Sequence, residues 1–133
     1  MGFAITENRS LRELEGVHAD LLAVVHRAAQ LSPHMFVITD GKRSLEEQRE
    51  YVAKGASRTM KSRHLVGCAV DFAVKHGNKI LWTDRLMCEV ADAFKAAAEE
   101  LGVPICWGGD WKGSWDKPHI ELDKGAYPDD WNA

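Results

Sequence analysis

Apolar residues recur at helical spacing in two long stretches of the chain. The first stretch opens with Ser10 and Glu13, which form a capping-box pattern, and stops at Ser32-Pro33. Its apolar positions are Leu11, Leu14, Val17, Leu21, Val24 and Ala28. The second stretch begins near Thr83 and stops at Gly102. Its apolar positions are Leu86, Val90, Phe94, Ala97 and Leu101. The spacing predicts one amphipathic helix in each stretch.

Shorter elements lie between these two helices and after the second. Ser44 and Glu47 form another capping box, which predicts a helix that ends at Gly55. Residues 35–39, 68–74, 105–107 and 118–122 have the length and composition of strands, and residues 56–67 read as a polar loop. Together the elements predict an α+β domain, in which a small antiparallel sheet packs against three helices.

The strand at residues 68–74 alternates between an apolar face and a face with one charge. Val70, Phe72 and Val74 share the first face, because side chains in a strand alternate with a period of two. Asp71 lies on the other face, where its small neighbours on either side are alanines and leave room around the carboxylate.

The strand at residues 118–122 repeats this division. Ile120 and Leu122 point one way, and His119 and Glu121 point the other way. If the two strands are neighbours in one sheet, Asp71 and His119 rise from the same surface. His64, in the preceding loop, would then close over them, and Gly67 would permit the sharp turn between loop and strand.

Two imidazoles and one carboxylate form a ligand set that suits zinc. Catalytic zinc usually has three protein ligands and keeps a fourth position open for water. His64, Asp71 and His119 would supply the three ligands, and a further carboxylate, Asp116, lies three residues before His119. The pattern therefore predicts a zinc hydrolase. A structural alternative exists for each residue, because Asp71 could be an ion-paired strand residue and either histidine could lie in the core or at the surface.

The two clusters also match a known family. The first reads Ser62-x-His64-x-x-Gly67-x-Ala69-x-Asp71, and the second reads Asp116-x-Pro118-His119-x-Glu121. This pair resembles the zinc D-alanyl-D-alanine carboxypeptidase and L-alanyl-D-glutamate endopeptidase family, over roughly residues 33–122. The stretch at residues 106–111, and residues 41–44 followed by Gln48, resemble the phage endolysin branch of that family.

The resemblance implies a fold like that of hedgehog domains and D,D-peptidases, and it assigns roles to individual residues. It implies that His64, Asp71 and His119 bind zinc and that Asp116 is the catalytic acid and base. Many relatives have glutamate where this chain has Asp116, so the reach of the carboxylate is shorter here. The resemblance also implies that Arg43 binds the substrate or the transition state. The alternative for Arg43 is a solvated residue before a helix.

Three functions fit these residues. The first is a phage endolysin that hydrolyses the L-alanyl-D-glutamate bond of peptidoglycan stem peptides and so lyses the cell wall. The second is a D-alanyl-D-alanine carboxypeptidase or dipeptidase on the same scaffold. Arg43 does not separate the two, because both substrates have a free carboxylate beside the scissile bond. The third is a non-catalytic zinc-containing binding module, and Asp116 argues against it because such a module needs no acid or base.

Composition limits the partners and the location. At 133 residues, we expect a single zinc peptidase domain over residues 1–133 with no separate wall-binding domain. The net charge of −3, without a basic stripe, argues against nucleic acid as a partner. No segment predicts a membrane span, a stable anchor or a secretory signal. With the endolysin resemblance, this predicts a monomer that is made in the host cytoplasm and reaches the wall through a separate holin.

The cysteines and tryptophans have alternative interpretations. Cys68, Cys88 and Cys106 form no CxxC pair, so we expect reduced thiols and neither a thiolate zinc site nor a Cys68 nucleophile. Trp107, Trp111 and Trp115 could line a wall for the substrate or simply pack. In the turn-rich tail after Leu122, only Tyr127 and Trp131 are expected to pack.

Overall fold

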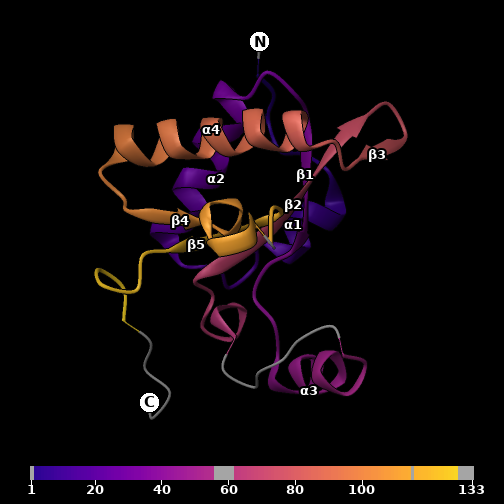
Figure 1. The fold of residues 1–133 in the computed structure, drawn as a ribbon, viewed down its shortest axis with the longest axis vertical. Coiled ribbons are helices and arrows are strands. Elements are labelled where there is room, and N and C mark those ends of the chain that lie inside the picture. Colours follow the sequence, from indigo (N-terminus) through magenta and orange to yellow (C-terminus); the bar gives the residue numbers. More distant parts are fainter. Residues whose placement is uncertain (1, 56–61, 115, 129–133) are drawn as a thin grey trace.

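The computed structural model describes residues 2–55, 62–114 and 116–128, and its centre is one antiparallel sheet (Figure 1). The strand order is β1-β2-β5-β4, and β3 pairs with the far end of β2. The strands are β1 (Phe36–Asp40), β2 (Ala69–His76), β3 (Lys79–Leu81), β4 (Ile105–Trp107) and β5 (His119–Leu122). The α+β class and the four expected strands are confirmed. The three-residue β3 is additional.

The first apolar stretch forms two helices, so the prediction of one continuous helix is wrong. These are α1 (Asn8–Glu13) and α2 (Ala19–Leu31). Gly16 lies between them with φ +82°, a left-handed backbone conformation that interrupts the helix. Ser10 is not a cap. Its buried hydroxyl donates to the Glu7 carboxylate and accepts a hydrogen bond from the Ile38 N–H.

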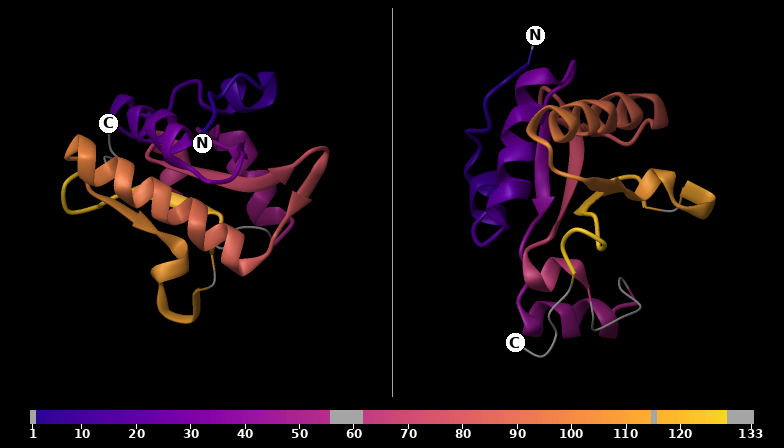
Figure 2. Two further views of the ribbon diagram at one scale, coloured as in Figure 1. Left: turned by 90° about the horizontal axis from the view of Figure 1, so that it is seen from above. Right: turned by 90° about the vertical axis from the view of Figure 1, so that its left-hand side faces the viewer.

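The other two helices begin and end close to their predicted limits. In α3 (Leu45–Ala53), the capping box between Ser44 and Glu47 is confirmed. The helix α4 (Asp84–Leu101) follows Thr83 and ends at Gly102, whose φ is +69°. Gln48 is the one buried residue of α3, which lies apart from α2 and α4 and next to the segment that contains His64 (Figures 1 and 2). The helices α2 and α4 pack together in one core with the apolar face of the sheet, and α1 contacts β1.

The sheet separates an apolar face from a polar face, as the alternation predicts. The side chains of Val70, Phe72, Val74, Ile120 and Leu122 are fully buried in the core with α2 and α4. On the opposite face, Asp71 of β2 pairs in register with His119 of β5. The expected juxtaposition of these two strands is confirmed. None of the helices in the described parts of the chain has the length and apolar character needed to cross a membrane.

Candidate metal centre

Three side chains converge on the polar face of the sheet. Suitable ligand atoms of His64, Asp71 and His119 all lie within 4.8 Å of one another. Asp71 Oδ1 is 3.4 Å from His64 Nε2 and 3.0 Å from His119 Nδ1. In the part of the chain that the structure describes, no other group of histidine, cysteine and carboxylate side chains converges in this way. The structure thus brings together the three residues that the sequence predicts as ligands.

A short 3₁₀ helix, η1 (Arg63–Val66), places His64 above the sheet. Ser62 caps this helix, because its Oγ accepts a hydrogen bond from the His64 N–H. Gly67 then turns the chain into β2 with φ +72°, and a Cβ there would lie 2.5 Å from the Gly16 carbonyl oxygen. The buried His64 ring donates from Nδ1 to the Gly41 carbonyl at 2.8 Å, which leaves Nε2 to face Asp71.

His119 is held from the opposite direction. Its Nε2 lies 2.8 Å from Glu121 Oε1, so Nδ1 is the nitrogen that faces Asp71. The Trp111 ring packs on the imidazole with a centroid distance of 5.2 Å. The sequence places Glu121 on the ligand-bearing face, but only the structure shows that it contacts His119.

The electrostatics of the cluster suit a cation. Burial raises the pKa of Asp71, but hydrogen bonds and charges from His119 and His64 outweigh burial and hold this pKa well below its usual range. Burial alone would lower the pKa of His119, yet hydrogen bonds to Asp71 and Glu121 raise it to about 9. The carboxylates around His119 therefore favour positive charge at this position, and a bound metal ion would supply such a charge. Two imidazoles and a carboxylate form a ligand set that fits zinc. In each imidazole, the nitrogen that points away from Asp71 already has a hydrogen-bond partner, which orients the ring.

Asp116 lies beside this cluster without being part of it. Its Oδ2 is 3.8 Å from His119 Nδ1, and its carbonyl oxygen accepts from the His119 N–H at 3.1 Å. Gly108 permits this placement, because a Cβ at that position would lie 2.0 Å from the Asp116 carbonyl oxygen. Burial raises the pKa of the Asp116 carboxyl. A carboxyl with a raised pKa next to a metal centre is suited to proton transfer.

Arg43 is buried, so its interpretation as a solvated residue is wrong. The side chain is 8% exposed, and its guanidinium forms an ion pair with Asp40. It also donates to Gln48 Oε1 at 2.6 Å and lies 4.2 Å from the centroid of the Tyr51 ring. The Arg43 N–H donates to the His64 carbonyl at 2.9 Å. These contacts tie the end of β1 to α3 and η1. The role in substrate binding stays a prediction.

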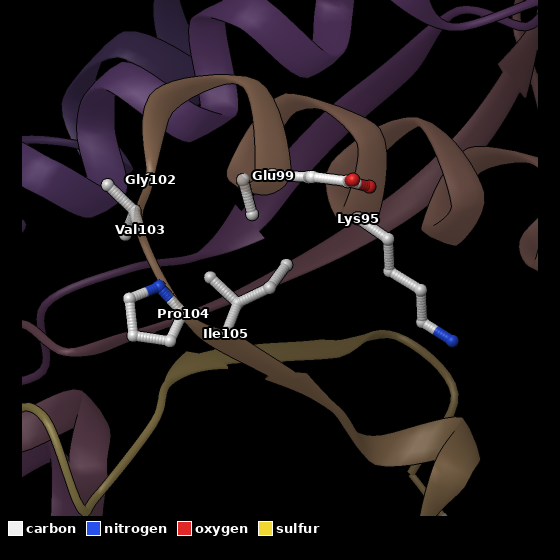
Figure 3. A pocket seen from close by; sticks show the side chains of 7 residues that line it. Lys95, Glu99, Gly102, Val103, Pro104 and Ile105 are labelled. Atoms are coloured by element: carbon white, nitrogen blue, oxygen red, sulfur yellow. The ribbon is translucent and has the colours of Figure 1, made fainter.

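Two cavities flank the strand β4 on opposite faces of the sheet. One, of about 350 Å³, lies between α4 and β4 on the helix-covered face, and it contains none of the expected site residues (Figure 3). The other, of about 310 Å³, lies on the polar face beside the metal centre. Its lining residues are Cys106, Trp111, Glu121, Asp123 and Lys124.

The remaining sequence predictions have mixed outcomes. Trp107 packs in the core, while Trp111 contacts His119. Trp115 and Trp131 lie outside the described residues. Tyr127 packs as expected, and its hydroxyl donates to Asp20 at 2.6 Å. None of the three cysteines forms a disulfide, and Cys68 lies in the apolar core, away from the face that holds Asp71.

Comparison with known proteins finds peptidases that are similar to this chain over most of its length. The family model for phage L-alanyl-D-glutamate peptidase matches residues 1–129. The L-alanyl-D-glutamate peptidase of Escherichia phage T5 is 37% identical over 131 residues, which cover 96% of this chain and 94% of that protein. The peptidoglycan L-alanyl-D-glutamate endopeptidase CwlK of Bacillus subtilis is 36% identical over 65% of this chain and 59% of its own length.

Two solved structures resemble the fold of this chain. The crystal structure of the Serratia marcescens L-Ala D-Glu endopeptidase ChiX has a TM-score of 0.86, with 39% identity and 93% of each chain covered. The vancomycin resistance D,D-dipeptidase VanXYg has a TM-score of 0.50 with 17% identity, over 80% of this chain and 50% of that one, and this likeness concerns the fold alone.

Proposed function

Since this chain belongs to the phage L-alanyl-D-glutamate peptidase family, we propose that it is a zinc-dependent endolysin. It hydrolyses the L-alanyl-D-glutamate bond of peptidoglycan stem peptides and thereby lyses the cell wall. The observation that carries this proposal is the convergence of His64, Asp71 and His119, with Asp116 beside them.

Each residue of the centre has a distinct task. His64, Asp71 and His119 hold the metal ion. Zinc, when bound, lowers the pKa of a water molecule to about 7 and polarises a carbonyl group. Asp116 takes a proton from the attacking water at its carboxylate and passes that proton to the leaving amine. Burial raises the pKa of the Asp116 carboxyl above its ordinary value, and a higher pKa makes its carboxylate a better proton acceptor.

The proposal extends to the location and the partners. We propose that the protein is made in the host cytoplasm and acts as a monomer on the wall after release through a separate holin. The similarity to the L-alanyl-D-glutamate peptidases of Escherichia phage T5 and Listeria phage A118 supports this cycle. The net charge of −3 supports neither nucleic acid nor an anionic membrane surface as a partner.

Digestion of purified peptidoglycan tests the proposed bond. The zinc-loaded protein should release fragments with new D-glutamate amino termini, which end-group labelling and mass spectrometry identify. Released D-alanine would instead indicate a D,D-carboxypeptidase or dipeptidase on the same scaffold. Absence of any product from a correctly folded, zinc-loaded protein would indicate a binding module.

Lysine is predicted to be a poor substitute for Arg43 in catalysis. Arginine binds carboxylates through a planar fork, and lysine does not reproduce that geometry. Arg43→Lys should therefore lose much of kcat/KM and Arg43→Ala nearly all of it. Because the pair with Asp40 is buried, Arg43→Ala should also lower the stability by about 3 kcal/mol, measured by denaturant unfolding.

A second substrate separates substrate binding by Arg43 from support of the fold. The stem peptide is compared with an analogue in which the D-glutamate α-carboxylate is amidated. If Arg43 binds that carboxylate, amidation lowers kcat/KM of the wild type and has little effect on Arg43→Ala. An equal effect of amidation on both proteins would restrict Arg43 to holding β1, α3 and η1 together.

A further inference from the structure

We infer that Glu121 is a positioning residue, which fixes the His119 ring so that Nδ1 binds the metal ion. This inference rests on the proposed zinc centre and extends it beyond the ligands. The geometry that points to it is the contact of 2.8 Å between Glu121 Oε1 and His119 Nε2, on the side of the ring away from Asp71.

The strand fixes Glu121 firmly in place. His119 and Glu121 are two residues apart in β5, so their side chains stand on the same face of the sheet. β5 is an inner strand, and Glu121 pairs in register with Ala69 of β2 and Cys106 of β4. The Glu121 side chain is 8% exposed. The backbone under the carboxylate is therefore held from both sides.

The direction of the hydrogen bond decides which nitrogen can bind a metal. A carboxylate that is ionised only accepts hydrogen bonds, so contact with Glu121 keeps a proton on Nε2 of His119. A metal ion that replaces the other ring proton would then bind at Nδ1, which is the nitrogen next to Asp71. His64 has the opposite arrangement, because its Nδ1 donates to the Gly41 carbonyl and its Nε2 faces Asp71. Glu121 thus does for His119 what a backbone carbonyl does for His64.

The position of Glu121 also makes a direct chemical test possible. Glu121 lines the cavity of about 310 Å³ on the polar face, together with Trp111 and Lys124. In Glu121→Ala, the space of the lost carboxylate joins this cavity. A small carboxylate from solution can then occupy the same place and accept the hydrogen bond from His119.

Zinc affinity is the first readout, measured by competition with a chromophoric chelator. Loss of a carboxylate that orients a ligating histidine typically weakens metal binding about 10- to 100-fold, which is the loss we expect for Glu121→Ala. Glu121→Gln keeps an acceptor oxygen and should lose less. Glu99→Ala removes an exposed carboxylate of α4 and should bind zinc as the wild type does. Unchanged zinc affinity in Glu121→Ala would overturn the inference.

Formate rescue and the His119 tautomer separate positioning from a general effect on folding. Formate should restore much of the zinc affinity of Glu121→Ala, and it should leave the wild type and His119→Ala unchanged. In the zinc-loaded wild type, ¹⁵N NMR should show the His119 proton on Nε2 and the metal on Nδ1. Failure of formate to restore any affinity, or zinc on Nε2 in the wild type, would contradict the positioning role.

The outcome is independent of whether the proposed function is correct. Both readouts follow the metal and need no peptidoglycan. A wild type that binds zinc but cleaves no wall would remove the proposed function and leave the role of Glu121 intact. A Glu121→Ala variant with normal zinc affinity would remove the role of Glu121 and leave the proposed function intact.

Discussion

Replacement of His64 or His119 by alanine should abolish zinc binding and cell-wall lysis together. Each imidazole would supply one of the three proposed ligands, and loss of either leaves only two of the three groups that converge on the site. In both variants, the metal content should fall from about one zinc per chain, as expected for this type of site, to a small fraction of that value. Metal analysis of the purified proteins and turbidity of a peptidoglycan suspension measure the two effects.

His26→Ala is a matched control, because His26 is exposed on α2 and lies outside the cluster. This variant should keep full zinc content and full lysis. Full zinc occupancy in both His64→Ala and His119→Ala would exclude these residues as ligands, whatever their activity.

Asp116→Asn should keep the zinc and the fold but lose turnover by a factor of roughly 10² or more. Asparagine has nearly the same shape as aspartate, yet it does not take up the proton that the reaction transfers. The separation of intact zinc content from lost kcat is the signature of an acid and base, and it distinguishes Asp116 from the ligands. Discontinuous assays on a purified stem peptide measure kcat, and metal analysis of the same samples measures the zinc content.

Two further variants serve as controls for Asp116→Asn. Asp110→Asn changes an exposed carboxylate in the same connection between β4 and β5 and should leave kcat unchanged. Asp116→Glu keeps a carboxylate at this position and should retain substantial activity. Near-normal cleavage by zinc-loaded Asp116→Asn would assign the proton transfer to another group. Glu121 is poorly placed for it, because it contacts the far side of His119.

The faces of the sheet could be predicted from the sequence because alternation in a strand is a local rule. Once β2 and β5 are neighbours, the period of two puts Asp71 and His119 on one surface and Ile120 on the other. Capping residues likewise fixed the start of α3 at Ser44. The motif resemblance then implied zinc as the metal and the roles proposed for Asp116 and Arg43.

Features that depend on tertiary contacts were not predictable in this way. Apolar spacing continued across Gly16, and only the left-handed backbone there shows that α1 and α2 are separate helices. The buried pair of Arg43 and Asp40 joins segments whose relative placement no periodicity describes. The contact between Glu121 and His119 depends on side-chain rotamers. The sequence pattern places both residues on one face but does not specify that contact.

The most direct test uses a synthetic muropeptide with an intact L-alanyl-γ-D-glutamate bond and a D-alanyl-D-alanine terminus. The protein is stripped with a chelator, and mass spectrometry follows the products before and after one equivalent of zinc is restored. We predict no cleavage by the stripped protein and, with zinc, cleavage only between L-alanine and D-glutamate. Equal cleavage without the metal, or release of D-alanine, would contradict the proposed zinc endopeptidase.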